Sequence, residues 1–264
     1  SQRPSTSGPQ RGLNIRISQE RIRSCFDWRV LHRRRGARVA TGNFLIKDGK
    51  FERVANQMAD EFVRDLTEGF RGTDIKAGML KCAADFEGVT PPLETMARAV
   101  ARAHVQTGVP IMVHSYPTGH VARRQIQIFR EEGVDLSRVK IDHCNDTTDT
   151  EYLEWILAQG CFLGLDRYPG RHVSPHMRTV TLKRLIDMGY GERLCPSHDC
   201  ICLHIHNEQA DGSIETEHVF QRSNPDQFLY MQRHVIPDLL AMGATEQDIH
   251  MLFVDNPRRL FEGR

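Results

Sequence analysis

Five side chains that could carry out chemistry stand at or near the ends of short apolar runs. They are Lys81, His114, His143, Asp166 and Asp199, and successive members are 33, 29, 23 and 33 residues apart. Imidazole nitrogens and carboxylate oxygens are ordinary ligands of catalytic zinc and similar divalent ions. Such an ion lowers the pKa of a bound water toward about 7, and a nearby carboxylate can then take or orient the proton. Any one of these residues alone is weak evidence, because a histidine beside a core is more often a hydrogen-bonded structural residue. The set predicts a metal site if the fold brings the five positions together.

Lys81 is the unexpected member, because an ammonium group repels a metal ion. It fits if carbon dioxide carboxylates its amine, since the resulting carbamate is an anion with two oxygens that can bridge two metals. This modification needs a neutral amine, and burial in an apolar strand depresses the pKa of a lysine in that direction.

The elements that must position these residues alternate between strands and helices. Helical patterns cover PLETMARAVARAHVQTG, which opens after a proline and ends on Gly108, and TDTEYLEWILAQG, with Thr148 or Asp149 as cap and Gly160 as stop. TVTLKRLIDMGYG has the same character. Short apolar runs lie between the helical patterns, at residues 37–42, 75–83, 109–115, 138–144, 161–167 and 193–199. Strands that alternate with helices predict a parallel sheet.

The spacing of about 30 residues between strand ends is typical of one fold class. Eight such units make a TIM (β/α)8 barrel of about 250 residues, and the chemistry of these barrels lies at the carboxyl ends of the strands. A doubly wound open sheet is the alternative, but no GxGxxG motif follows a strand, so dinucleotide binding has no support. The sequence therefore predicts an α/β protein with a TIM-type barrel.

The N-terminal part does not supply a complete set of units. LNIRIS (13–18) alternates as a strand could, which brings the count to seven, and residues 1–12 are expected to be irregular. We therefore expect a barrel that is incomplete at its N-terminus and lacks the first strand. The expected division is an atypical basic segment over residues 1–36 and a barrel domain over residues 37–264.

Charge and composition limit the classes of protein. Net charge is +1, yet residues 1–38 hold ten arginines against Glu20 and Asp27, a net of +8 that leaves about −7 for the rest. A basic arm of this kind can touch nucleic acid or anionic lipid, but it has no interleaved aromatics, so a solvated tail is the preferred interpretation. There is no apolar run of about 18 residues and no secretory signal pattern. Seven scattered cysteines favour a reduced, cytoplasmic setting over a disulfide framework.

Several motifs from about Ala40 to Phe261 resemble one known family. They are VATG, GTDIKAGMLKCA, ARAHVQTGVPIMVHS, IFREEGVDLSRVKIDHCNDTTDTEYL, GLDR, SHD and VDNPRRLF, and together they span over four fifths of the chain. This part of the chain is similar to the phosphotriesterase-like branch of the amidohydrolase superfamily, which includes phosphotriesterases and lactonases.

The resemblance implies a role for each motif residue. It implies that Lys81 is a carbamylated metal bridge, that His114 and His143 are metal ligands, and that Asp199 is both a ligand and the proton acceptor. Two further roles follow from the same resemblance. Asp146 would take part in proton relay, and Asp166 and Arg167 would lie near the substrate. The implied cofactor is one or two divalent ions, most simply zinc.

One part of the family pattern is missing. The family places a His-x-His pair on its first strand, and nothing before VATG contains such a pair. The chain has one His-x-His, at His204 and His206, beyond the last predicted strand. Residues i and i+2 of a strand share a face, so this pair is a conceivable substitute.

Two hypotheses about function remain open at this stage. The first is a zinc-type hydrolase in which metal-bound hydroxide attacks a small-molecule ester, lactone or phosphotriester. Arg167 leans this choice toward lactones and carboxylic esters, because a guanidinium can donate to a carbonyl oxygen. The alternative is a truncated or degenerate barrel paralogue without catalytic activity. Neither hypothesis needs a nucleic acid or a membrane as partner, and both leave a homodimer open.

Overall fold

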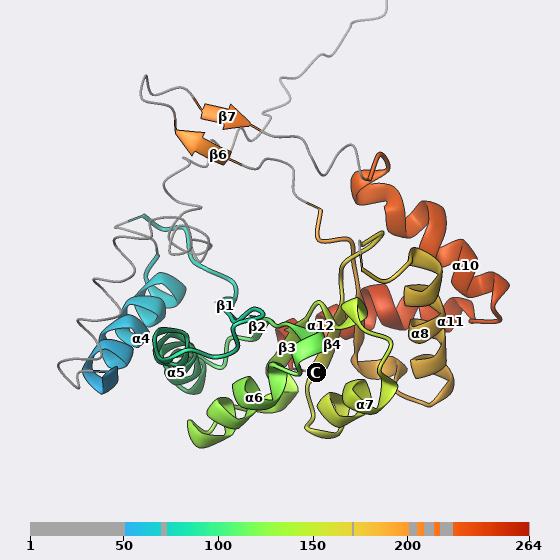
Figure 1. Ribbon diagram of the computed structural model, residues 1–264. Coiled ribbons are helices and arrows are strands. Elements are labelled where there is room, and N and C mark those ends of the chain that lie inside the picture. The colour runs from blue at the N-terminus through green and yellow to red at the C-terminus, as the bar shows by residue number, and fades with distance from the viewer. Residues whose placement is uncertain are drawn as a thin grey trace, which may run out of the picture.

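The computed structural model describes residues 51–69, 73–170, 172–200, 205–208, 214–216 and 224–263 (Figure 1). The helices are α4 Phe51–Thr67, α5 Pro91–Thr107, α6 Ala122–Glu131, α7 Thr150–Ala158, α8 Pro175–Asp187, α10 Ile236–Ala241, α11 Glu246–His250 and α12 Asn256–Glu262. The strands are β1 Leu80–Ala83, β2 Ile111–His114, β3 Val139–Asp142, β4 Phe162–Leu165, β5 Leu194–Pro196, β6 Ile205–Glu208 and β7 Ile214–Thr216. The segments predicted before residue 51, including the runs at 13–18 and 37–42 and the boundary at residue 36, lie outside the described residues.

Strands β1 to β5 form one parallel sheet in which neighbours in space are also neighbours in sequence. The order is β1-β2-β3-β4-β5, and all four pairings are parallel. A doubly wound sheet reverses its strand order at a switch point, whereas a barrel adds each strand beside the previous one. The observed order confirms the prediction of barrel-type α/β topology, and each of the five strands lies within a run that the sequence predicted.

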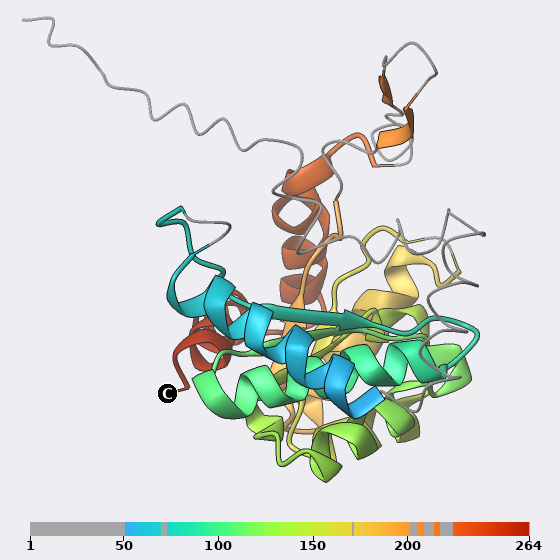
Figure 2. The ribbon, with the colours of Figure 1, turned by 90° about the vertical axis from the view of Figure 1, so that its left-hand side faces the viewer.

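The two faces of this sheet have opposite chemistry. One face carries buried apolar side chains such as Leu80, Ile111 and Ile141, which pack into the main hydrophobic core beneath the helices. Helices α5, α6 and α7 lie along this side of the strands (Figures 1 and 2). On the other face, Lys81 pairs in register with Met112, which pairs with Lys140, so the two lysines share that face. The sheet face opposite the hydrophobic core therefore carries charged side chains near the carboxyl ends of the strands.

Helices α5 and α7 begin and end close to the predicted residues, whereas α8 begins at Pro175, four residues before the predicted TVTLK pattern. Pro91 opens α5, and the helix ends at Gly108, whose φ of 69° is readily adopted only by glycine. Asp149 caps α7 by accepting a hydrogen bond from the backbone N–H of Tyr152 at 3.1 Å. The Asp149 cap marks the end of the loop between β3 and α7, which carries His143 and Asp146.

The C-terminal helices complete the described part of the fold. Asn256, fully buried at the start of α12, donates from its side chain to the carbonyl oxygens of Gly191 (2.7 Å) and Leu194 (2.8 Å), which ties α12 to the start of β5. Strands β6 and β7 form a separate antiparallel hairpin. Within the described ranges, no helix has the length and apolar character needed to span a membrane.

Candidate metal centre

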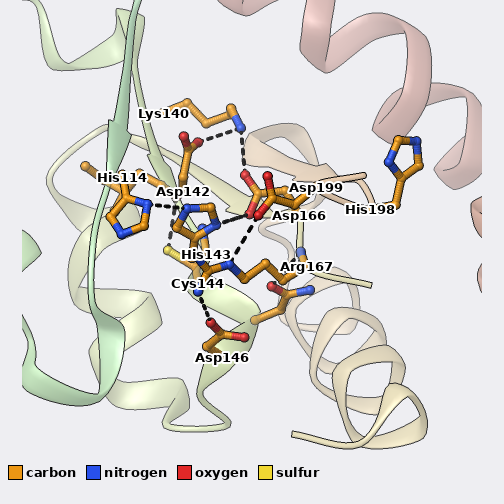
Figure 3. A network of polar contacts seen from close by, with 12 residues as sticks. His114, Lys140, Asp142, His143, Cys144, Asp146, Asp166, Arg167, His198 and Asp199 are labelled. Atoms are coloured by element: carbon orange, nitrogen blue, oxygen red, sulfur yellow. Dashed lines mark hydrogen bonds and ion pairs between the residues drawn. The ribbon is translucent and has the colours of Figure 1, made fainter. Parts of the chain in front are cut away.

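Two histidine rings meet where β2 and β3 end. His114 is the last residue of β2, and His143 directly follows β3 with a left-handed φ of 67°. The Nε2 atom of His143 lies 2.7 Å from the Nδ1 atom of His114, and both residues are buried, at 4% and 5% exposure (Figure 3). A left-handed conformation is uncommon for a non-glycine residue and is often found at functional sites. The turn after β3 therefore points one imidazole nitrogen at the other.

Asp166, just past the end of β4, fixes the orientation of His143. Its Oδ1 atom lies 2.8 Å from the backbone nitrogen of His143 and 3.0 Å from the ring Nδ1 (Figure 3). A carboxylate at Nδ1 favours the tautomer with the proton on that nitrogen, which leaves the lone pair on Nε2. Burial alone would raise the pKa of Asp166, but Lys140 and His143 hold that pKa well below its usual value. The carboxylate is therefore anionic and holds His143 as a metal-ligating histidine is held.

The surroundings of His114 favour its neutral form. Burial lowers the pKa of its imidazole, only partly opposed by Asp85, whose Oδ2 lies 3.5 Å from Nε2. The nearby ring of His143 lowers the pKa of His114 further. A neutral imidazole is the form that binds metals. Both histidines that the sequence predicted as ligands therefore lie together, with two ring nitrogens facing each other.

Two lysines and two aspartates form a buried charged cluster beside the histidines. Lys81 makes an ion pair with Oδ2 of Asp142, whose side chain is 1% exposed. Lys140 Nζ lies 2.6 Å from Asp142 Oδ1 and 3.2 Å from Asp166 Oδ2, and its own side chain is 8% exposed. Burial would lower the pKa of Lys140, but Asp142 and Asp166 raise it above its ordinary value. The cluster contains two cations and two anions and is thus electrically balanced.

Sequence reasoning missed Lys140 and Asp142, although a signal was present. In VKID the charged residues alternate with Val139 and Ile141, so both must point to the face opposite the apolar core. An apolar strand with two charges on one face predicts a buried ionic site, because isolated buried charges are costly. The same cluster explains Gly164, where a Cβ would lie 2.9 Å from Asp166 Oδ2 and from Asp142 Cα.

A second group of contacts joins Asp146, Arg167 and Asp199. Arg167 lies just past β4 and donates from Nη1 to Asp146 Oδ2 at 2.7 Å, while its Nε lies 3.4 Å from Asp199 Oδ2 (Figure 3). The carboxylates of Asp146 and Asp199 raise the pKa of Arg167, against the effect of its burial. The Asp199 side chain is 45% exposed and has a left-handed φ of 44°. The structure therefore brings together the three residues that the SHD, GLDR and CND segments contribute.

Other candidate ligands stand in less suitable places. His198 points away from this network (Figure 3), and its ring packs edge-on against Phe228 at 5.1 Å. Burial raises the pKa of the Cys82 thiol to about 12 and also raises that of Cys144, so neither is poised to bind as a thiolate. The side chains of the His204 and His206 pair lie outside the described residues.

The arrangement fits a divalent ion in part. Among the residues that the structure describes, no three histidine, cysteine, aspartate or glutamate side chains form a group that could hold a metal. His114 and His143 supply two nitrogens 2.7 Å apart, and two nitrogen ligands of a tetrahedral zinc are about 3.3 Å apart, given bonds of about 2.0–2.1 Å. A small ring movement would make room for the ion. A zinc ion would need a third ligand, and Lys81, the residue predicted to supply it, contacts Asp142 in the structure.

Comparison with known proteins gives matches to one family and to several of its relatives. A model of the phosphotriesterase family matches residues 41–261. A "phosphotriesterase homology protein" of Mycobacterium tuberculosis is 41% identical over 208 residues, which cover 78% of this chain and 61% of the relative. An aryldialkylphosphatase of Saccharolobus solfataricus is 34% identical over 228 residues, covering 84% of this chain and 71% of the relative.

A solved structure extends the comparison to the fold. The structure of a phosphotriesterase from Mycobacterium tuberculosis superposes with a TM-score of 0.70 at 41% identity, covering 77% of this chain and 61% of that one. The chain thus spans about three fifths of the length of the mycobacterial proteins it matches.

Proposed function

The chain belongs to the phosphotriesterase family of the amidohydrolase superfamily and has the TIM-barrel fold of that family, and from this premise we propose that it is a metal-dependent hydrolase. The proposed substrates are small-molecule esters, lactones or phosphotriesters. The observation that carries the proposal is the facing pair of His143 Nε2 and His114 Nδ1, 2.7 Å apart, with Asp166 behind His143.

The proposed ligands are His114, His143 and a carbamate on Lys81, with Asp199 as a further ligand, and zinc is the proposed ion. A bound divalent ion would lower the pKa of a water molecule and polarise the electrophilic oxygen of the substrate. Asp166 would keep His143 in the tautomer whose Nε2 can bind, because Asp166 accepts from both N–H groups of that residue.

The remaining residues would act on the substrate and on protons. Asp199, partly exposed at the rim, would accept the proton released when water attacks. Arg167 would donate to the carbonyl or phosphoryl oxygen, since its side chain is 32% exposed and carries a permanent charge. Asp146 would serve proton relay next to Arg167. Asp166 is 6% exposed and engaged by Lys140 and His143, so we assign it to the support of His143 and leave substrate contact to Arg167.

A non-catalytic barrel is the second candidate, and one observation favours it. Lys81 is engaged with Asp142 in an ion pair, a contact that the carbamate form would have to give up. In this alternative the charged cluster serves only to hold the strand ends together.

Elemental analysis and a substrate panel test the proposal. The full chain would be incubated with zinc and bicarbonate, dialysed, and assayed for bound metal and for turnover of an aryl ester, a lactone and a phosphotriester. We expect at least one retained ion per chain and turnover of at least one substrate class that a strong chelator abolishes. A protein that retains no ion and turns over none of the three would support the non-catalytic barrel.

We also propose that the protein works in the cytoplasm. Four cysteines of the described chain, Cys82, Cys144, Cys161 and Cys195, are buried free thiols, as expected in a reducing compartment.

A further inference from the structure

Arg178 is a fully buried arginine that no step of the proposed mechanism uses. It lies in the first turn of α8, and its side chain has 0% exposure. All three guanidinium nitrogens have partners: Nε donates to Val173 O at 2.9 Å, Nη1 to Asn145 O at 2.6 Å, and Nη2 to Asp146 Oδ1 at 2.8 Å. Burying a charge is costly unless it is paired and hydrogen-bonded, and here the charge is paired and each of the three nitrogens has an acceptor.

The space around this guanidinium is closed on the side of the loop that follows β4. A Cβ at Gly170 would lie 2.1 Å from Nη2 and 2.2 Å from Cζ of Arg178. Real Cβ atoms do not approach so closely, so a side chain at Gly170 would displace the guanidinium. Arg178 is therefore held between the turn after β3 and the loop after β4.

The partners of Arg178 are also the partners of Arg167. Asp146 accepts a hydrogen bond from Arg178 at Oδ1 (2.8 Å) and one from Arg167 at Oδ2 (2.7 Å). Asn145 accepts from Arg178 at its backbone carbonyl oxygen (2.6 Å) and from the backbone N–H of Arg167 at its side-chain Oδ1 (3.1 Å). The buried Arg178 thus contacts both residues that contact the partly exposed Arg167.

We propose that Arg178 is a positioning residue that locks Asn145 and Asp146 and, through them, places the Arg167 guanidinium beside Asp199 (Figure 3). The inference deepens the proposed function, since it takes Arg167 as the group that meets the substrate. The physical reason is geometric. A planar guanidinium with three bonds in fixed directions defines the position of its acceptors better than a flexible ammonium can. With Asp146 anchored on one oxygen, the other oxygen can hold Arg167 in one place.

A glycine substitution tests whether Arg178 positions Asp146 and Arg167, without removing any charge. Gly170→Ala should push the guanidinium of Arg178 away from Asp146, and Gly189→Ala is the matched control. Both glycines have positive φ, +73° and +89°, but a Cβ at Gly189 meets nothing within 4 Å. In crystal structures of the two variants, Arg167 should have moved away from Asp146 in Gly170→Ala and should still donate to Asp146 in Gly189→Ala.

Kinetic measurements test whether the contacts of Arg178 with Asn145 and Asp146 contribute to turnover. In Arg178→Met we expect kcat/KM to fall by about 10–100-fold, the range seen when support behind a site is removed, with zinc content unchanged because Arg178 contacts none of the proposed ligands. Arg178→Lys should recover only part of the loss, since one ammonium cannot replace all three bonds. The exposed Arg184 of α8 supplies the control, Arg184→Met, which should behave as wild type.

A double-mutant cycle separates positioning from general structural support. If Arg178 acts through Asp146, then Arg178→Met should cost much less activity in an Asp146→Asn background than in the wild type. Additive losses would overturn the proposal, and so would an Arg167 that keeps its place in Gly170→Ala. Should Arg178→Met fail to fold, Gly170→Ala and Arg178→Lys still decide. Should the wild type hydrolyse no substrate, the proposed function fails, while the crystal structures still decide whether Arg178 positions Arg167.

Discussion

His143 and Asp166 meet at two points, the backbone nitrogen at 2.8 Å and the ring Nδ1 at 3.0 Å from one carboxylate oxygen. With the left-handed φ of 67° at His143, the backbone N–H and the ring of this residue reach the same carboxylate oxygen. The ring and the backbone of the residue are thus fixed by one partner from the neighbouring strand.

Replacement of Asp166 should therefore weaken metal binding. In Asp166→Asn, we expect the zinc dissociation constant to rise by about 10–100-fold, the usual effect of losing the carboxylate behind a ligating histidine. Competition with a chromophoric chelator measures the constant. Asp187→Asn, at the exposed end of α8, is the control. Equal zinc affinities of wild type and Asp166→Asn would show that the double contact serves the fold alone.

Removal of the His114 ring should change how stability depends on pH. The folded-state pKa of His114 is lowered from its ordinary value of 6.5. Below pH 6.5 the unfolded chain binds a proton that the folded chain does not, so this contribution to stability is complete above about pH 6.5 and declines as pH falls below it. Urea unfolding of metal-free protein between pH 5 and 8 measures the slope.

In His114→Gln we expect that slope to become shallower between pH 5 and 6.5. The exposed His176 provides the comparison, since His176→Gln should keep the wild-type slope. An unchanged slope in His114→Gln would mean that other groups set the pH dependence.

The sequence was sufficient to predict the five parallel strands and the proximity of His114 and His143, for identifiable physical reasons. Apolar runs of β-branched residues, a proline at the start of α5 and a glycine after it are local signals. The placement of His114 and His143 side by side then follows from parallel strand order. The five-strand topology could be predicted because each unit repeats the same local pattern.

The contacts of the charged residues could not be predicted in the same way. The pairing of Lys81 with Asp142 and the sharing of Asp146 between Arg167 and Arg178 depend on side-chain directions across strands and loops that are 21 to 61 residues apart. Arg178 received no role from the sequence, because nothing in MRTVTLK shows that Gly170 leaves space for its guanidinium. Such contacts are decided by packing, which periodicity does not encode.

Arg167 should contribute to turnover without contributing to metal binding. Its guanidinium lies between Asp146 and Asp199 and is partly exposed. A hydrogen bond to a charged group is worth about 1.5–3 kcal/mol, so Arg167→Met should lower kcat/KM by about 10–100-fold at unchanged zinc content. Arg123→Met, which removes an exposed guanidinium stacked 4.3 Å from the Trp155 ring, is the control. Loss of zinc in Arg167→Met would instead tie Arg167 to the metal ligands.

The charge of the buried cluster leads to the last prediction. Lys81, Lys140, Asp142 and Asp166 carry two positive and two negative charges in the structure. Conversion of the Lys81 ammonium to a carbamate changes the charge by −2, and a divalent ion restores the balance. In the wild type we therefore expect carbamate and metal to appear together. ¹³C NMR of protein equilibrated with ¹³C-bicarbonate should show a carbamate signal with zinc and none, or a weak one, without it.

Removal of the Asp142 charge should allow the carbamate to form on Lys81 without a bound metal ion. In Asp142→Asn, Lys81 loses its anionic partner, and a carbamate at Lys81 no longer faces the Asp142 carboxylate across a buried contact. The carbamate signal should then rise in zinc-free protein above that of the wild type, and Lys81→Met should abolish the signal in every sample, which assigns it. Asp60→Asn, on the exposed side of α4, is the control for the loss of one negative charge elsewhere. A zinc-free wild type that is already carbamylated as fully as Asp142→Asn would show that the ion pair with Asp142 does not hold Lys81 in its unmodified form.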